Sequence, residues 1–264
     1  MKKVFALIEK ESTKFAQLPF FEFLGNKSID FIQRLSFAPC FALFVMGYGD
    51  LNKFVWLQEA TVNSIPDIVN KQIREEENHW IWFLNNLEYL NLNLFLNFTD
   101  SLKFNWSEHT VICRQISFQV NPIYKLVGIE SIESISNLFL SITAPVTQKL
   151  KVLTNREYPY FVNAHLLAEN DHNVHSHETK EFIASMHLAE YIHKQACELV
   201  NKIFELFTAL VDMLINFAEE YKIKQLLNRS RSHNGRGATA GVKYARCCSF
   251  YVTLFSTRRY ANNA

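Results

Sequence analysis

The sequence predicts an all-α protein, an up-and-down helical bundle, and three observations support this prediction. Apolar residues recur at helical spacing through most of the first 222 residues, only seven Gly and six Pro interrupt the 264 residues, and no convincing strand precedes residue 240. Hydrophobic residues make up 48% of the chain, enough for a sizeable core. We therefore expect one helical domain over residues 1–222 and an irregular, basic tail over residues 223–264.

Charge is distributed unevenly along the chain. Nine Lys and Arg and no Asp or Glu follow residue 220, so the first 220 residues carry a net charge of −8 although the whole chain is at +1. The tail begins with a linker-like run of Ser, Arg, Asn and Gly and contains a strand-like segment at 248–255 that has no partner strand. A basic tail that binds nucleic acid is an alternative, but the tail carries no recognised motif and we expect no nucleic-acid partner.

Cysteine usage and hydropathy predict a cytoplasmic protein. The five cysteines form no Cys-x-x-Cys pair, which favours free thiols in a reducing compartment. The apolar run after Lys2 and Lys3 is too short for a signal peptide. The longest uncharged run, from Leu35 to Gly49, is shorter than the roughly 20 residues that span a bilayer, so no membrane partner is expected.

The expected helical elements follow one another with short connections. In chain order they are a short helix and an aromatic loop at Pro19 within residues 5–26, a long helix over 29–60 with Pro39 placed to kink it, a helix over 67–91 after a turn at 61–66, a helix over 122–153, a segment over 157–176, and a long helix over 178–222. Residues 92–121 have weak periodicity and are expected to form a loop with a short helix.

Residues 157–176 carry the most informative pattern. In a helix, Glu169 lies about 40° from His165 and His172 lies about 20° to the other side, so the three side chains share one face. Apolar residues lie on the same face, so the three groups are expected to point into the core, where an ionised carboxylate needs a partner. Two imidazoles and a carboxylate in this arrangement predict a metal site.

A second pair of candidate ligands lies in the helix expected over 67–91. Glu76 falls in the middle of its apolar face, whereas Glu75 and Glu77 lie about 100° to either side. His79 follows one turn later. Glu-x-x-His is a recurring way for one helix to give two ligands to a metal pair.

Two further helices are expected to give one carboxylate each. An antiparallel helix before the turn places Asp50 level with the predicted site, and Glu59, which points the other way, is its alternative. In the long helix that follows, Glu133 is preferred because apolar residues flank it, and Glu130 is its alternative.

Together these residues give four carboxylates and three imidazoles, a set that suits two ferrous or manganous ions. The predicted ligands are Asp50, Glu76, His79, Glu133, His165, Glu169 and His172. A single inward His is more often a hydrogen-bonded core residue, so the agreement between several helices carries the prediction. His187 and Glu190 have the same residue types at the same spacing, but they lie off the apolar stripe and are expected on a solvated face.

The order of these ligands resembles the haem-oxygenase-like diiron oxidase and oxygenase superfamily. Glu-x-x-His at 76–79, Glu133 and the pattern at 165–172 match its motifs, and the resemblance covers roughly residues 20–222. Asp50 departs from the family, which has Glu at this position, and the tail has no counterpart. Two short segments resemble an uncharacterised bacterial branch of this superfamily. They are Asp-Leu-Asn-Lys, which begins at residue 50, and His-Trp-Ile-Trp-Phe-Leu, which begins at residue 79.

This resemblance implies a haem-oxygenase-like bundle of about seven helices with a labile pair of non-haem irons, manganese being the alternative metal. It implies an oxidase or oxygenase that uses dioxygen as co-substrate to oxidise a small organic molecule, such as an amino acid or a fatty acid. Leu43, Met46, Trp80 and Phe83 are candidates to line the substrate cavity, although plain core packing more often explains such residues. Besides the substrate, the partner left open is a second copy of the chain in a homodimer.

Three other functions remain open at this point. A haem enzyme of the same fold needs a proximal His near the N-terminus, and no His precedes His79. A thiaminase-like, metal-independent hydrolase needs a Cys nucleophile, for which Cys113 is the only mid-chain candidate. A non-catalytic binding protein would use the buried His and Glu as a hydrogen-bonded polar core.

Overall fold

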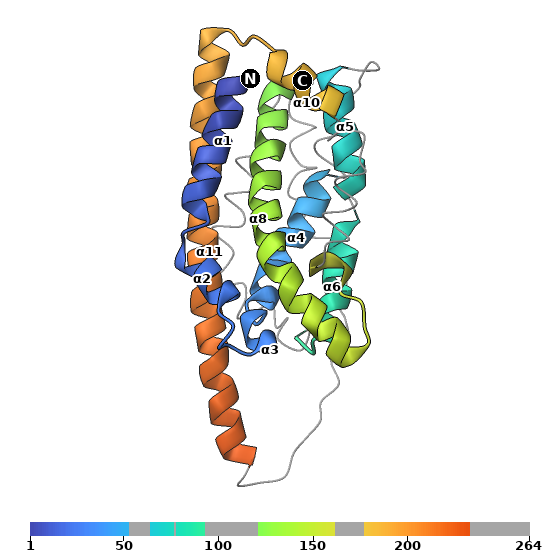
Figure 1. Cartoon of the computed structure of the whole chain (residues 1–264), viewed down its shortest axis with the longest axis vertical. Coiled ribbons are helices and arrows are strands. Elements are labelled where there is room, and N and C mark those ends of the chain that lie inside the picture. The colour runs from blue at the N-terminus through green and yellow to red at the C-terminus, as the bar shows by residue number, and fades with distance from the viewer. Residues whose placement is uncertain (53–63, 77, 93–120, 162–176, 233–264) are drawn as a thin grey trace, which may run out of the picture. The chain divides into compact units, whose positions relative to one another are not determined.

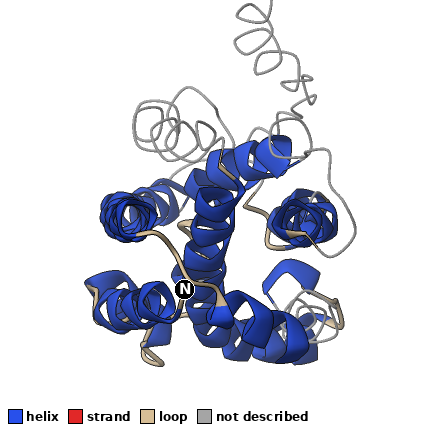
Figure 2. Cartoon of the chain, turned by 90° about the horizontal axis from the view of Figure 1, so that it is seen from above, coloured by secondary structure: helices blue, strands red, loops and turns tan. Residues whose placement is uncertain are grey.

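The protein is all-α in the part of the chain that its structure, a computed structural model, describes. The described residues are 1–52, 64–76, 78–92, 121–161 and 177–232. Within these ranges 84% of the residues are helical and no strand occurs, which confirms the all-α prediction (Figure 2). The chain divides into two units, Met1–Leu226 and Leu227–Ala264, and the description below concerns the first.

The helices are connected mostly by short turns (Figure 1). In chain order the described elements are α1 (Lys2–Phe15), α2 (Pro19–Gly25), α3 (Phe31–Arg34), α4 (Ala38–Leu51), α5 (Ile65–Glu76), α6 (His79–Tyr89), α8 (Pro122–Thr154), the 3₁₀ helix η3 (Pro159–Phe161), α10 (His177–Ser185) and α11 (Glu190–Ser232).

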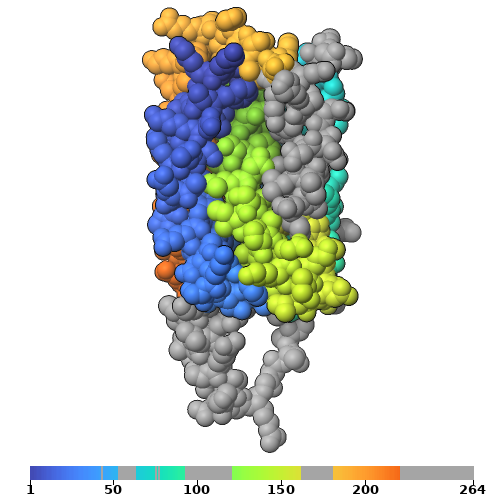
Figure 3. Space-filling view, viewed as in Figure 1, coloured from blue at the N-terminus to red at the C-terminus, as the bar shows by residue number. Residues whose placement is uncertain are grey.

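The helix α8 organises the first unit. It packs against α1, α2, α3, α5 and η3, and Figure 3 shows α1 and α2 lying along it. Asn121 caps the start of α8, because its side chain accepts a hydrogen bond from the Ile123 N–H at 2.9 Å. The helix stops at Asn155, which adopts the left-handed conformation with φ 52°. This confirms the helix expected over 122–153.

The composition of α8 also meets the length and hydropathy requirements of a membrane span. Of its most apolar stretch, 61% is buried among the other helices of the unit. Packing inside the unit therefore accounts for much of this apolar surface, as in the core helix of a globular domain.

Two expected helices are each divided in two, which corrects the sequence prediction. The stretch at 67–91 forms α5 and α6, because Asn78, with φ −112° and ψ 0°, does not continue the helix. The stretch at 178–222 forms α10 and α11, which residues 186–189 separate. Neither break contains Pro or Gly, the residues that usually mark one.

The positions of two prolines explain the other corrections. The segment predicted as an aromatic loop is α2, and Pro19 occupies its first turn, where a missing N–H costs no helical hydrogen bond. Pro39 likewise lies in the first turn of α4 and does not kink a helix over 29–60. The short α3 precedes it, capped by Asp30, which accepts from the Ile32 N–H at 2.9 Å.

An aromatic cluster joins α2, α4, α6 and α8. The Phe20 ring packs edge to face on Phe37, with centroids 5.1 Å apart, and stacks on Phe139 at 6.4 Å. Phe41 and Phe83 extend the cluster with centroids 6.0 Å apart. Aromatic pairs of this kind each add about 0.5–1.5 kcal/mol beyond the burial of their area.

Replacement of Phe20, which is 1% exposed, by Ala should lower the free energy of unfolding by about 3–5 kcal/mol, because it removes these contacts and leaves a cavity. Urea denaturation followed by far-ultraviolet circular dichroism measures this loss. The matched control is Phe182→Ala, at a side chain that is 48% exposed, and its cost should be within about 1 kcal/mol. Equal losses in the two variants would contradict this account of the core.

Candidate functional site

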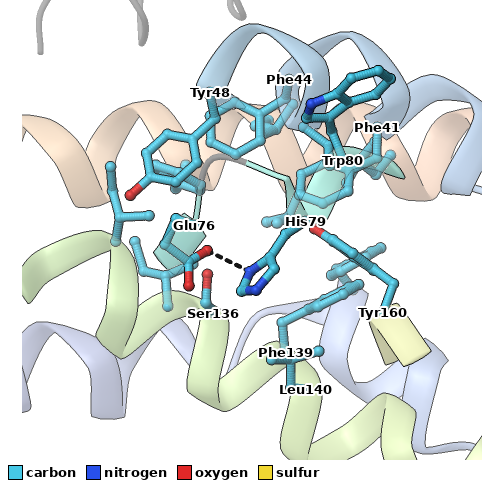
Figure 4. A pocket seen from close by; sticks show the side chains of 18 of the residues that line it. Phe41, Phe44, Tyr48, Glu76, His79, Trp80, Ser136, Phe139, Leu140 and Tyr160 are labelled. Carbon is cyan, nitrogen blue, oxygen red and sulfur yellow. Dashed lines mark hydrogen bonds and ion pairs between the residues drawn. The ribbon is translucent and has the colours of Figure 1, made fainter. Parts of the chain in front are cut away.

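A small cavity lies inside the first unit, and its walls are mainly aromatic and aliphatic (Figure 4). Its volume is about 60 Å³. An engineered cavity of roughly 150 Å³ binds benzene, so this one has room only for a few water molecules or a ligand of two or three heavy atoms. The described residues that line it are Phe15, Phe20, Phe21, Phe41, Phe44, Val45, Tyr48, Gly49, Glu76, His79, Trp80, Ile132, Ile135, Ser136, Phe139, Leu140, Tyr160, Phe207, Leu210, Val211 and Leu214.

A hydrogen-bonded pair of Glu76 and His79 lies in this wall. Oε2 of Glu76 is 2.8 Å from Nδ1 of His79, and the two side chains are only 12% and 9% exposed. Glu76 ends α5 and His79 begins α6, so the pair bridges the break at Asn78. The His79 ring also stacks on Trp82, with centroids 4.6 Å apart and an interplanar angle of 24°. These contacts fix both groups at the edge of the cavity.

Tyr160 of η3 contributes a phenol to the same cavity. Burial, and then the nearby Glu76 carboxylate, raise the pKa of Tyr160 well above its usual range. Its backbone N–H donates to Oδ1 of Asn86 on α6 at 3.1 Å. Tyr160 is not among the residues predicted for the site, although Pro159 beside it is typical of a boundary between elements.

Two of the other predicted ligands lie near the cavity without lining it. Asp50, in α4, is half-buried and follows the lining residue Gly49. Glu133, in α8, is 5% exposed and follows the lining residue Ile132, while its alternative Glu130 is half-buried. In the part of the chain that the structure describes, no three His, Cys, Asp or Glu side chains are gathered closely enough to hold a metal ion. Glu76 and His79 contact each other directly.

The remaining predicted ligands lie outside the described residues. These are His165, Glu169 and His172, and the same holds for Glu59, Cys113 and most of the basic tail.

The predicted wall residues have different positions. Trp80 lines the cavity. Phe83 is fully buried and packs on Tyr160 but is not among the lining residues, and Met46 is half-buried in α4. His187 and Glu190 are exposed, as the sequence predicted.

The chain was compared with known protein families and with curated proteins. No family profile matches it, and no curated protein matches it at a significant level.

Replacement of Tyr160 by Phe should change how stability depends on pH. Below about pH 10 the phenol is protonated in both the folded and the unfolded chain, so pH has no effect through this group. Above that pH the unfolded chain releases the proton while the buried phenol keeps it, so the native protein should lose stability relative to Tyr160→Phe by up to about 1.4 kcal/mol per pH unit. Urea unfolding of both proteins below and above this pH measures the difference. If the free energy of unfolding changes with pH by the same amount in both proteins, the prediction is wrong.

Proposed function

We propose that the chain is a metal-dependent oxidase or oxygenase, which uses dioxygen to oxidise a small organic substrate, with two iron ions as cofactor and manganese as the alternative. The observation that carries this proposal is the buried carboxylate–imidazole pair of Glu76 and His79 at the edge of a small apolar cavity. The resemblance of the ligand order to the haem-oxygenase-like diiron superfamily supports it, and the proposal includes that fold.

The chemistry of this pair fits such a metal. Carboxylate oxygen and imidazole nitrogen are the ligands that ferrous and manganous ions take in oxygen-activating sites. Glu-x-x-His pairs supply them in helical bundles of the carboxylate-bridged type. Without a cation the two groups share a hydrogen bond of 2.8 Å, and a bound cation would take its place. We propose Asp50, Glu133, His165, Glu169 and His172 as the further ligands.

The remaining lining residues would control what reaches the metal. When bound, the iron ions would supply the electrons that reduce dioxygen. The aromatic rings of Phe41, Phe44 and Phe139 would exclude water, which strengthens electrostatic interactions inside the site. A cavity of about 60 Å³ accepts dioxygen as it stands, whereas an organic substrate requires lining side chains to move. Cytoplasmic location and a homodimer stay predictions of the sequence.

Anaerobic titration with ferrous iron tests the proposal. The native chain should bind about two irons, and Glu76→Gln or His79→Gln should lose most of this binding because each removes a ligand of the pair. Iron content is measured after desalting, and circular dichroism checks that the helices are retained.

His187→Gln and Glu190→Gln are the matched controls, because they change the same residue types on the exposed surface. Both should bind iron as the native chain does. Normal iron content in Glu76→Gln and His79→Gln would overturn the proposed function.

A further inference from the structure

The C-terminal end of α8 exposes apolar side chains to water. Val152 and Leu153, in its last turn, are 80% and 70% exposed, the two highest values among the large hydrophobic residues that the structure describes. Single exposed apolar side chains are normal on a protein surface. Two adjacent ones at a helix end form a patch, and such a patch is typical of a surface that binds a partner.

Two further exposed apolar residues lie at the same end of the unit. The helix α3 packs on α8, and the ring of Phe31 lies 5.7 Å from Nζ of Lys149. Figure 1 shows α3 and the end of α8 side by side at one end of the bundle. Ile32 follows Phe31, and Tyr89 of α6 has its ring 5.3 Å from the Arg156 guanidinium. Four of the seven exposed large hydrophobic residues in the described ranges therefore gather at this end.

This end of α8 is also basic, although the first 220 residues have a net charge of −8. Residues 134–156 contain no Asp or Glu and three cations, which are Lys149, Lys151 and Arg156. Lys151 pairs with Glu157 at 2.6 Å, whereas Lys149 and Arg156 are exposed. Lys149 lies one turn before the two exposed apolar residues and shares their helical face. The helix dipole favours cations at a C-terminus, but it does not explain the apolar pair beside them.

We propose that the end of α8, together with Ile32 and Tyr89, docks on the anionic surface of a membrane. The apolar side chains would enter the interfacial layer, and the Lys and Arg side chains would contact lipid phosphates. Tyr and Lys side chains suit a membrane interface, whereas Lys is depleted at interfaces between proteins. The small apolar area and the few cations predict a reversible contact.

This docking surface is independent of the proposed function, because none of its residues lines the cavity. The sequence prediction of no membrane partner rested on the length needed to span a bilayer. A contact with the membrane surface needs no spanning segment.

Sedimentation of the full chain with vesicles tests the proposal. Vesicles of about three parts phosphatidylcholine to one part phosphatidylserine supply the anionic surface, and pure phosphatidylcholine is the neutral comparison. The native chain should bind the anionic vesicles more tightly. The double variant Val152→Ser/Leu153→Ser should bind them about ten-fold more weakly, because it removes the apolar contacts. Lys149→Gln/Lys151→Gln should also lose about ten-fold, since a cation near such a surface contributes about five-fold and Glu157 engages one of the two.

Two double variants elsewhere on the unit are the matched controls. Phe182→Ser/Tyr191→Ser removes two exposed hydrophobic side chains from α10 and α11. Lys194→Gln/Lys202→Gln removes one exposed lysine and one that pairs with Glu205 at 2.8 Å, as Lys149 and Lys151 do at the end of α8. Both controls should bind like the native chain. The basic residues after residue 220 are the same in every variant, so their contribution to binding is common to all.

The outcomes decide between the membrane and other partners. Weaker binding in both α8 variants, with native binding in both controls and unchanged circular dichroism, supports the proposal. Equal binding by all variants, or a native chain that binds neither kind of vesicle, overturns it. A native chain that ignores vesicles and forms a dimer, which Val152→Ser/Leu153→Ser dissociates in gel filtration, shows that the surface binds a second copy and overturns the membrane proposal.

Discussion

Burial of the Glu76 carboxylate among aromatic side chains is the constraint on which the site depends. A carboxylate taken out of water is costly unless it is hydrogen-bonded, and Nδ1 of His79 lies 2.8 Å from it. The break at Asn78 lies between the two residues, so the pair links the end of α5 to the start of α6. Loss of either residue would remove this hydrogen bond across the break.

The helix α8 supplies the opposite wall because of its apolar spacing. Its cavity-lining residues follow the i, i+3, i+4, i+7 spacing of one helical face: Ile132, Ile135, Ser136, Phe139 and Leu140. Two turns further along, Thr147 holds η3 through the Phe161 carbonyl oxygen. One helix thus both closes the cavity and positions the segment that brings Tyr160 to it.

The sequence predicted the elements that have strong periodicity and missed the points where the backbone changes direction. The helix over 122–153 follows from apolar spacing, and the structure confirms it. Glu76 and His79 contact each other, although the single helix expected to hold both is broken between them. The apolar spacing continues past Asn78, so the hydrophobic pattern predicted one helix where the structure has α5 and α6. Tyr160 reaches the cavity through tertiary contacts with Asn86 and Phe83, and no local pattern encodes such contacts.

Most buried polar residues in the described part of the chain lie in α5, α6 and α8. The helices α1 and α2 bury apolar side chains, whereas α5 and α6 bury Asn70, Gln72, His79 and Asn86. In α8 the buried hydroxyl groups of Ser131 and Thr143 donate to carbonyl oxygens of their own helix, at 2.7 and 3.1 Å. Both amide atoms of Gln72, by contrast, are buried without a hydrogen-bond partner among the described residues. Packing alone would favour apolar residues at these α5 and α6 positions, and of the four polar residues only His79 lines the cavity.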